Sequence, residues 1–286
     1  MSKIGLVLSG GMAKGAYQAG ALRAIGEIFS PSDFLVSSAS VGALNSYAFC
    51  TYGLDKWFSV WDTLDSNNQR KWITKMIKSG YLQTIIEELT SNGISIENTF
   101  YIPLVNIKKR KLVYVDIAKM SPAEAEAYLR ASVAVPVFNS GVQINGEFFY
   151  DGALIDNIPI APIFKHDVDY TICIYFDNYN YTFENENLDN KIIKINFSDN
   201  KIISSSICFS KASIDYMTSE GYTKAKKIIQ YVFADGTDKL SVVPRIEALN
   251  STETSKSLRI TGDIIVNNMN KIAKKFFHKV ETAVAE

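Results

Sequence analysis

The chain has 286 residues, of which 47% are hydrophobic and 21% charged, with 30 Lys+Arg against 30 Asp+Glu. This composition excludes intrinsic disorder as the main state, because disorder requires low hydrophobicity together with high net charge. A formal net charge of zero provides no long-range field for collecting polyanions, so no nucleic-acid partner is expected.

The three cysteines and the apolar runs indicate where the protein resides. Cys50, Cys173 and Cys208 are widely spaced and flanked by apolar residues, which predicts buried thiols rather than a disulfide framework or a zinc site. The apolar run 4–8 is too short for a signal-peptide core, and no stretch reaches the roughly 18 apolar residues of a membrane span. We therefore expect a soluble, cytoplasmic protein, with export that needs no signal peptide left open.

Two strand–turn–helix units open the chain. The apolar run 4–8 stops at Ser9-Gly10-Gly11, and a helix rich in small residues is expected from Ala13. A second strand at 34–36 passes through a serine-rich turn into another small-residue helix at 41–48. Two such units predict an α/β fold with a parallel sheet covered by helices.

Hydrophobic periodicity and helix-cap residues also predict the elements in the rest of the chain. A helical insertion is expected over 54–93, where large apolar residues recur at three- and four-residue steps. Ser121, Pro122 and Glu124 form a capping box that should begin a helix ending near residue 132. The other expected elements are strands at 101–107, 111–117, 147–150, 170–176 and 192–197, a polar loop at 178–190, and helices at 210–233 and 263–285.

The glycine-rich turn after the first strand is the first candidate site. Backbone N–H groups at the start of a helix can hold an anion. A dinucleotide fingerprint fails because Met12 occupies its second glycine, and a P-loop fails because Gly15 is followed by Ala16-Tyr17 instead of Lys-Ser/Thr. The remaining interpretations are an anion hole for a charge that forms during a reaction and a tight turn without chemistry.

The second candidate is Ser40, on the turn between a strand and a helix. Small residues two positions before and after it, Ser38 and Gly42, let the backbone turn sharply and present the hydroxyl at the sheet edge. This pattern predicts a nucleophile elbow, although Ser38 replaces the usual first glycine. The alternative is that Ser40 only caps the helix.

A serine nucleophile needs a base, and the chain contains two histidines. His166 lies in a polar stretch, and His278 lies among lysines on the last predicted helix, so neither is a convincing partner. Asp151 follows the strand 147–150 and precedes Gly152, where its carboxylate could face Ser40. An Asp-Gly pair is also common in simple turns.

Three blocks carry a resemblance to a known family. They are the segment from Leu8 to Gly20, the elbow at Ser40, and Asp151-Gly152-Ala153 followed by Asn157-Ile158-Pro159. Their order and spacing resemble those of the patatin-like phospholipases. The resemblance covers about residues 4–200 and implies a three-layer α/β/α catalytic domain with a mostly parallel sheet, including the insertion at 54–93. Residues 201–286 would form a helical C-terminal extension packed on the same domain.

The resemblance also implies a mechanism. Ser40 would attack a lipid acyl ester, Asp151 would accept its proton, and the N–H groups of Gly10, Gly11 and Met12 would hold the oxyanion. The supporting positions of the motif are Lys14, Gly15, Ser38, Gly42, Gly152 and Ala153. Met12 and Ser38 stand where the family has glycine, and Ala153 is a variant of the third position in the Asp block. No metal and no cofactor are expected.

Other functions remain open at this stage. An acyltransferase would use the same acyl-enzyme with a different acceptor, whereas a phosphate-binding protein or an inactive interaction protein would need no chemistry. The expected partners are a lipid substrate and a transient membrane or micelle surface, and no protein partner can be named. The predicted helix at 263–285 has an apolar face that would either pack on the domain or lie on lipid.

Overall fold

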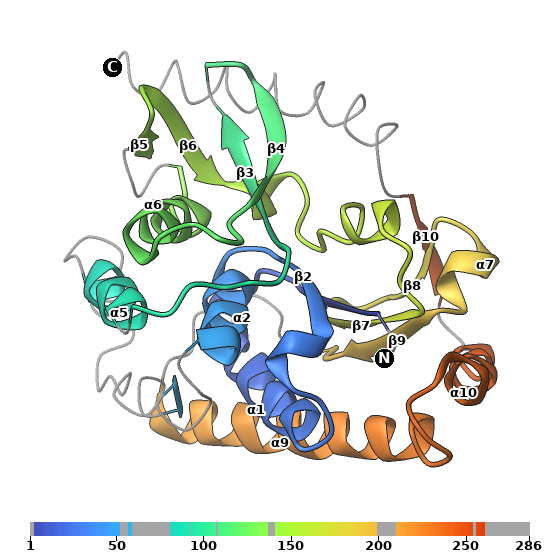
Figure 1. The fold of residues 1–286 in the computed structure, drawn as a ribbon. Helices are drawn as coiled ribbons and strands as arrows, with labels where there is room; N and C mark the ends of the chain where they lie inside the picture. Colours follow the sequence, from blue (N-terminus) through green and yellow to red (C-terminus); the bar gives the residue numbers. More distant parts are fainter. Residues whose placement is uncertain are drawn as a thin grey trace.

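The computed structural model describes residues 3–51, 57–58, 81–91, 93–106, 108–136, 141–198, 210–253 and 256–260. Its centre is an eight-stranded sheet in the order β5-β6-β3-β2-β1-β7-β9, with β4 paired to β3 (Figure 1). The strands of this sheet are β1 (Ile4–Leu8), β2 (Phe34–Ser38), β3 (Phe100–Asn106), β4 (Lys111–Asp116), β5 (Val142–Ile144), β6 (Glu147–Asp151), β7 (Tyr170–Tyr175) and β9 (Ile192–Asn196).

Four of the strand pairings are parallel, namely β1–β2, β1–β7, β2–β3 and β7–β9. The pairings of β3 with β4, β3 with β6 and β5 with β6 are antiparallel. Every residue of β1, β7 and β9 is buried, as expected for parallel strands covered on both faces. The prediction of an α/β fold with a mostly parallel sheet is therefore confirmed.

The helices are α1 (Gly15–Gly26), α2 (Val41–Thr51), α5 (Tyr81–Thr90), α6 (Pro122–Ser132), α7 (Glu186–Asp189), α9 (Lys211–Val232) and α10 (Lys239–Ser251). Alternation along β1 separates the two faces of the sheet. Leu6 and Leu8 belong to the main core with α1, α2 and α9, whereas Val7 packs with residues from 158 to 168, which include a short 3-10 helix, η4 (Ile163–Lys165).

The C-terminal part of the chain packs closely on the first helix. α9 lies along α1 (Figure 1), and the two helices cross at Gly20 and Gly221. A Cβ atom at Gly20 would lie 2.0 Å from the Thr218 carbonyl oxygen, and one at Gly221 would lie 2.1 Å from the Tyr17 carbonyl oxygen. Because α1 begins directly after the glycine-rich turn, α9 supports the element that carries this turn.

Several local predictions can be compared with the structure. The helix that begins at Pro122 is confirmed, since the Ser121 side chain and the Glu124 backbone form the expected capping box. The prediction of a loop at 178–190 is wrong, because this segment contains β8 (Asn180–Phe183) and α7. β8 pairs with β10 (Lys256–Arg259), which follows more than 70 residues later in the sequence, so local pattern could not reveal it.

Some predictions fall on residues that the structure does not describe. Most of the predicted insertion at 54–93 lies outside the described residues. In its described part, residues 57–58 and α5 are helical. The predicted helix at 263–285, Cys208 and His278 also lie outside them. Of the other two cysteines, Cys173 is buried as predicted, whereas Cys50 is partly exposed.

Candidate active site

The turn that carries Ser40 has the geometry of a nucleophile elbow. β2 ends at Ser38, α2 begins at Val41, and Ser40 between them has a φ of 54°. This left-handed conformation is uncommon outside glycine and is typical of the strained strand-to-helix turn that exposes a nucleophile. A Cβ atom at Gly42 would lie 2.7 Å from the Ser9 carbonyl oxygen, so glycine is required for α2 to begin this close to β1.

Ser38, which replaces the first glycine of the elbow, is accommodated by a specific partner. It is fully buried, and its hydroxyl lies 2.7 Å from the hydroxyl of Ser46 one turn into α2. A buried hydroxyl without a partner would destabilise the turn, but here the two hydroxyls satisfy each other. Serine in place of glycine at position 38 is therefore compatible with the tight turn at Ser40.

Asp151 lies at the end of β6, and its side chain reaches the elbow. The Asp151 carboxylate accepts a 2.8 Å hydrogen bond from the Ala153 N–H, and the Ser40 hydroxyl lies beside it. The residue is 3% exposed, and this burial raises its pKa from 3.8 to about 7, although the Ser40 hydroxyl and the Ala153 N–H act in the opposite direction. A carboxylate with this pKa can accept and return a proton near neutral pH.

Gly152 fixes the position of this aspartate against the sheet. A Cβ atom at Gly152 would lie 2.3 Å from the carbonyl carbon of Pro103 in β3. The next strand residue, Leu104, pairs with Asp151 across the sheet, and the Asp151 N–H donates to the Ala134 carbonyl at 2.9 Å. Asp151 is therefore held by backbone contacts on both sides.

The glycine-rich turn lies directly beside Ser40. A Cβ atom at Gly10 would lie 3.0 Å from the Ser40 Cβ and 3.1 Å from the Ala153 Cβ. The Gly10 N–H donates to the Asn157 carbonyl oxygen at 3.2 Å, and the Asn157 side-chain amide donates to the Gly10 carbonyl at 3.3 Å. The structure thus brings together all three sequence blocks, and the Asn157 clamp joins the first to the third.

The N–H groups of Gly11 and Met12 differ from that of Gly10. Within the part of the chain that the structure describes, neither donates a hydrogen bond. Met12 has a φ of 51°, which is the conformation that a glycine adopts freely, and its partly buried side chain packs against the main core. The side chain at this position therefore does not prevent the turn that a glycine would make.

Lys14 and Gly15 lie on the protein-facing side of the turn. Lys14 is 1% exposed, and its Nζ lies 5.9 Å from the centre of the Phe176 ring. The same ring approaches Gly11, where a Cβ atom would lie 2.5 Å from it. The Gly15 carbonyl accepts a 2.9 Å hydrogen bond from the Asn45 amide in α2. These contacts tie the turn to Phe176 and to α2.

A buried hydrogen-bond chain that the sequence did not reveal also holds this turn. The Gln18 amide donates to the Ser9 carbonyl at 2.7 Å, Asn45 donates to the Gln18 carbonyl oxygen at 2.9 Å, and Trp57 donates to the Asn45 carbonyl oxygen at 2.6 Å. The signal was present as two polar residues inside helices of small residues. Gln18 and Asn45 are fully buried, so their hydrogen bonds hold the turn between the end of β1 and the start of α1 against α2.

The loop after Asp151 is anchored a second time, by Asp156. Its carboxylate accepts a 2.6 Å hydrogen bond from the Tyr114 hydroxyl and forms a 3.0 Å ion pair with Arg259 on β10. Burial raises the pKa of Asp156, and Arg259 and Tyr114 oppose that shift. Arg259 also lies 5.3 Å from the Tyr181 ring centre. The C-terminal strand is thereby tied to the loop that carries Asp151 and Asn157.

Replacing Arg259 with Gln is expected to lower the free energy of unfolding by about 2 kcal/mol, because it leaves the largely buried Asp156 carboxylate without its cation. Urea unfolding of the purified variant measures this change. Arg245→Gln is the matched control, because its ion pair with Asp235 is more exposed and should contribute less than about 1 kcal/mol. Equal losses in the two variants would contradict the anchoring role of Arg259.

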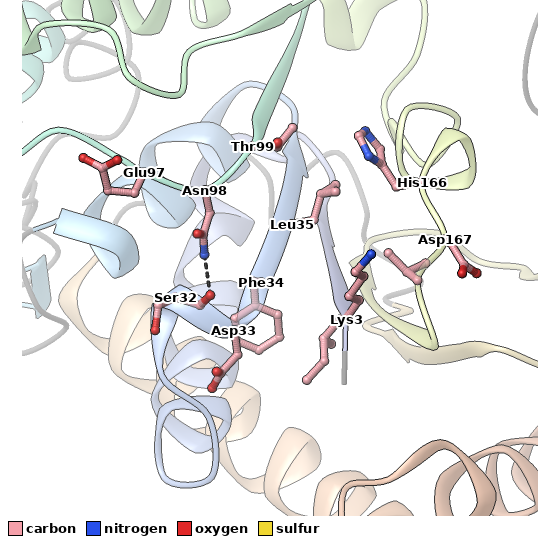
Figure 2. Close-up of a pocket in the computed structure, with 12 residues that line it drawn as sticks. Lys3, Ser32, Asp33, Phe34, Leu35, Glu97, Asn98, Thr99, His166 and Asp167 are labelled. Carbon is pink, nitrogen blue, oxygen red and sulfur yellow. Dashed lines mark hydrogen bonds between the residues drawn. The ribbon is translucent and has the colours of Figure 1, made fainter. Parts of the chain in front are cut away.

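His166 lies away from these residues. Its Nε2 is 3.1 Å from the Tyr101 hydroxyl, and it lines a cavity of about 470 Å³ together with Lys3 and Phe34 (Figure 2). Lys3 and Phe34 lie at the amino ends of β1 and β2, whereas Ser40 follows the carboxyl end of β2. The histidine and the serine therefore lie at opposite ends of the parallel strands.

The described residues contain neither a cluster of metal ligands nor a helix that could span a membrane. Among them, no group of three or more His, Cys, Asp or Glu side chains is placed to hold a metal ion. None of the described helices is both long and apolar enough to cross a bilayer.

Comparisons with known proteins identify the family. The crystal structure of VipD from Legionella pneumophila matches with a TM-score of 0.45 and 13% identity, over 80% of this chain and 67% of that one. The ExoU–SpcU heterodimer from the type III secretion system of Pseudomonas aeruginosa matches with a TM-score of 0.37 and 14% identity, over 87% of this chain and 59% of that one. No curated protein sequence matches. The family model for patatin-like phospholipases matches residues 6–164, more than half of the chain, and the protein therefore belongs to this family, which supports lipid hydrolysis as its general activity.

Proposed function

We propose that the protein hydrolyses lipid acyl esters through an acyl-enzyme on Ser40, with Asp151 as the general base. The observation that carries this proposal is the position of the Ser40 hydroxyl beside the buried Asp151 carboxylate, whose pKa it lowers, next to a turn in which the N–H groups of Gly11 and Met12 donate no hydrogen bond among the described residues. A nucleophile, a base and an anion hole within contact of one another are what acyl transfer requires.

In the first half-reaction, Asp151 accepts the Ser40 proton while the serine oxygen attacks the ester carbonyl. The carbonyl oxygen gains a negative charge, which the N–H groups of Gly11 and Met12 stabilise in our proposal. The carbon–oxygen bond to the alcohol then breaks, and the alcohol leaves with the proton that Asp151 held. The acyl group remains on Ser40.

In the second half-reaction, a water molecule gives a proton to Asp151 and attacks the acyl-enzyme. The fatty acid leaves, and the proton returns from Asp151 to Ser40. α2 begins immediately after Ser40, so the positive end of its dipole also faces the developing oxyanion. In this scheme Gly10 would not bind the oxyanion, because its own N–H already donates to Asn157, and its role would be to let the turn approach Ser40 closely.

The proposal is tested by labelling with an active-site-directed fluorophosphonate and by assays of p-nitrophenyl esters, lysophospholipids, phospholipids and monoacylglycerols. We expect label on Ser40 alone, and loss of both label and hydrolysis in Ser40→Ala. Ser251→Ala, an exposed serine on α10, should keep both. Label on another serine, or hydrolysis that persists in Ser40→Ala, would refute the assignment.

The rate should also depend on pH with a defined sign. Asp151 accepts a proton only as a carboxylate, and its pKa is raised to about 7. We therefore expect kcat/KM for a soluble ester to rise with pH and level off above about pH 8, with an apparent pKa near 7. A profile that stays flat from pH 5 to 9, roughly two units on either side of that pKa, would show that another group limits the reaction.

A further inference from the structure

Three consecutive carbonyl groups in the glycine-rich turn, those of Ser9, Gly10 and Gly11, each accept a hydrogen bond. Their donors are, in order, the Gln18 amide at 2.7 Å, the Asn157 amide at 3.3 Å and the Lys14 N–H at 3.1 Å. The described residues contain no cis peptide bond. In a planar trans peptide, the carbonyl of one residue and the N–H of the next point in opposite directions. Each of these hydrogen bonds therefore also fixes the direction of the N–H group that follows.

The three N–H groups that follow these carbonyls differ in what fixes them. The Gly10 N–H already donates to the Asn157 carbonyl oxygen at 3.2 Å. The Met12 N–H is directed by the local chain, because the hydrogen bond from Lys14 to the Gly11 carbonyl closes the 3-10 helix η1 (Met12–Lys14). The Gly11 N–H is directed by Asn157, which lies 147 residues along the chain from the Gly10 carbonyl that its side chain holds. The direction of one N–H group thus depends on a side chain from the third sequence block.

The segment that carries Asn157 is itself fixed on both sides. The preceding residue, Asp156, is held by its ion pair with β10. Two residues after Asn157, the Pro159 carbonyl accepts a 2.6 Å hydrogen bond from the buried Ser37 hydroxyl in β2. The backbone carbonyl and the side-chain amide of Asn157 together occupy both backbone groups of Gly10. Asn157 therefore reaches the turn from a fixed support.

A side chain is needed here because glycine leaves the turn free to rotate. The peptide group between Gly10 and Gly11 is flanked by two residues without a Cβ atom, and glycine adopts many backbone conformations. A hydrogen bond weakens steeply as its angle departs from linearity, so rotation of this peptide would remove much of the stabilisation that its N–H can give. A donor that is held in place before the reaction needs no reorganisation during it.

We propose that Asn157 is a positioning residue, which directs the Gly11 N–H toward the oxyanion by holding the Gly10 carbonyl. This inference rests on the proposed function, in which the Gly11 N–H stabilises the negative charge. In this role Asn157 acts through Gly10 and makes no contact with the ester. An asparagine suits the role because its amide is an uncharged donor, whereas an aspartate in the same place would present a second oxygen to the carbonyl.

The test removes this donor in two ways. Asn157→Ala deletes the amide and leaves the hydrogen bond between the Gly10 N–H and the backbone carbonyl of residue 157. Asn157→Asp keeps the shape of the side chain but exchanges its N–H donor for an oxygen. The matched control is Asn98→Ala. Asn98 is also partly buried, and its amide also donates to a backbone carbonyl, that of Ser32, beside the cavity at the amino ends of the strands (Figure 2).

Three measurements are made on each protein. Steady-state kinetics on a soluble p-nitrophenyl ester give kcat, KM and the pH profile, and urea unfolding gives the stability. Inhibition by a trifluoromethyl ketone gives a Ki. The Ser40 oxygen attacks the ketone carbon to form a tetrahedral adduct whose former carbonyl oxygen carries the negative charge, so this Ki reports the oxyanion hole.

We expect Asn157→Ala to lower kcat by about 10- to 100-fold, which is less than the loss of a whole donor. KM should stay unchanged and Ki should rise by the same factor, because the lost interaction exists only in the transition state. The pH profile should keep its apparent pKa near 7, since Asp151 is not altered. Asn157→Asp should lose at least as much activity, and Asn98→Ala should keep kcat, KM and Ki.

Wild-type kcat and Ki in Asn157→Ala would overturn the inference. So would a loss of kcat with an unchanged Ki, which would show that residue 157 serves the fold rather than the oxyanion hole. If Asn157→Ala did not fold, Asn157→Asp would decide by the same measurements. The proposed function fails separately, if the wild type shows no hydrolysis that depends on Ser40. An active wild type with an unaffected Asn157→Ala refutes the positioning role alone.

Discussion

Asp151→Asn is expected to lower kcat by about two to four orders of magnitude, the usual contribution of a general base. The amide cannot accept the Ser40 proton, although it fills the same space and can still accept a hydrogen bond. Steady-state kinetics on a soluble ester measure the loss. His166→Ala should retain wild-type kcat, because His166 lies at the other end of the parallel strands. A folded but inactive His166→Ala would contradict the dyad.

Asp151→Asn should also increase the free energy of unfolding, and this increase separates a catalytic role of Asp151 from a structural one. The folded pKa of Asp151 is about 7 and its ordinary value is 3.8, so the folded state holds more protons between these values. Stability is therefore lost as pH rises through this window, and above pH 7 the buried carboxylate costs on the order of 4 kcal/mol. Asn carries no charge and avoids this cost.

Urea unfolding at pH 5 and pH 8 tests this sign, since these values lie well below and about one unit above the raised pKa. Asp151→Asn should be more stable than the wild type at pH 8, and the difference should shrink at pH 5. Asp215→Asn is a suitable control, because its side chain is 54% exposed and forms an ion pair with the exposed Lys211 side chain. A variant that loses both activity and stability at pH 8 would indicate that Asp151 serves mainly to hold the loop.

The features that the sequence predicted are those encoded within a few residues. The capping box at Ser121 and the tight strand-to-helix turn at Ser40 depend on neighbours less than five residues away, and their geometry follows from local backbone chemistry. Met12 shows where a prediction from neighbouring residues alone fails. Its side chain suggests a blocked turn, but the backbone adopts the left-handed conformation of a glycine and the side chain packs on the core.

The features that the sequence missed depend on distant partners. β8 becomes a strand only because β10 pairs with it, and Asp156 is anchored by Arg259, which is 103 residues away. The hydrogen bonds of Gln18 join α1 to α2 and to the end of β1, and no periodic pattern reports them. Each of these contacts joins residues near the candidate site to the C-terminal part of the chain or to a second helix. The sequence shows the individual residues but not which distant residues they contact.

Gly221→Ala is expected to lower the free energy of unfolding by about 3 kcal/mol. Helix propensity alone would favour Ala at this position by about 1 kcal/mol, so a loss would report the contact with α1 rather than the helix itself. The added Cβ would lie 2.1 Å from the Tyr17 carbonyl oxygen, which is backbone and cannot rotate away as a side chain could. The two helices would have to separate.

This separation should also reach the site, because α1 begins at Gly15, directly after the turn that carries Gly11 and Met12. Urea unfolding and ester hydrolysis of the same preparation test both effects, with Ser219→Ala as the control on the exposed side of α9. We expect Gly221→Ala to lose stability and to show a lower kcat, while Ser219→Ala changes neither. If Gly221→Ala were as stable as the wild type, the close crossing of α1 and α9 would not exist in solution. If it lost stability but kept full kcat, α9 would stabilise the core without positioning the glycine-rich turn.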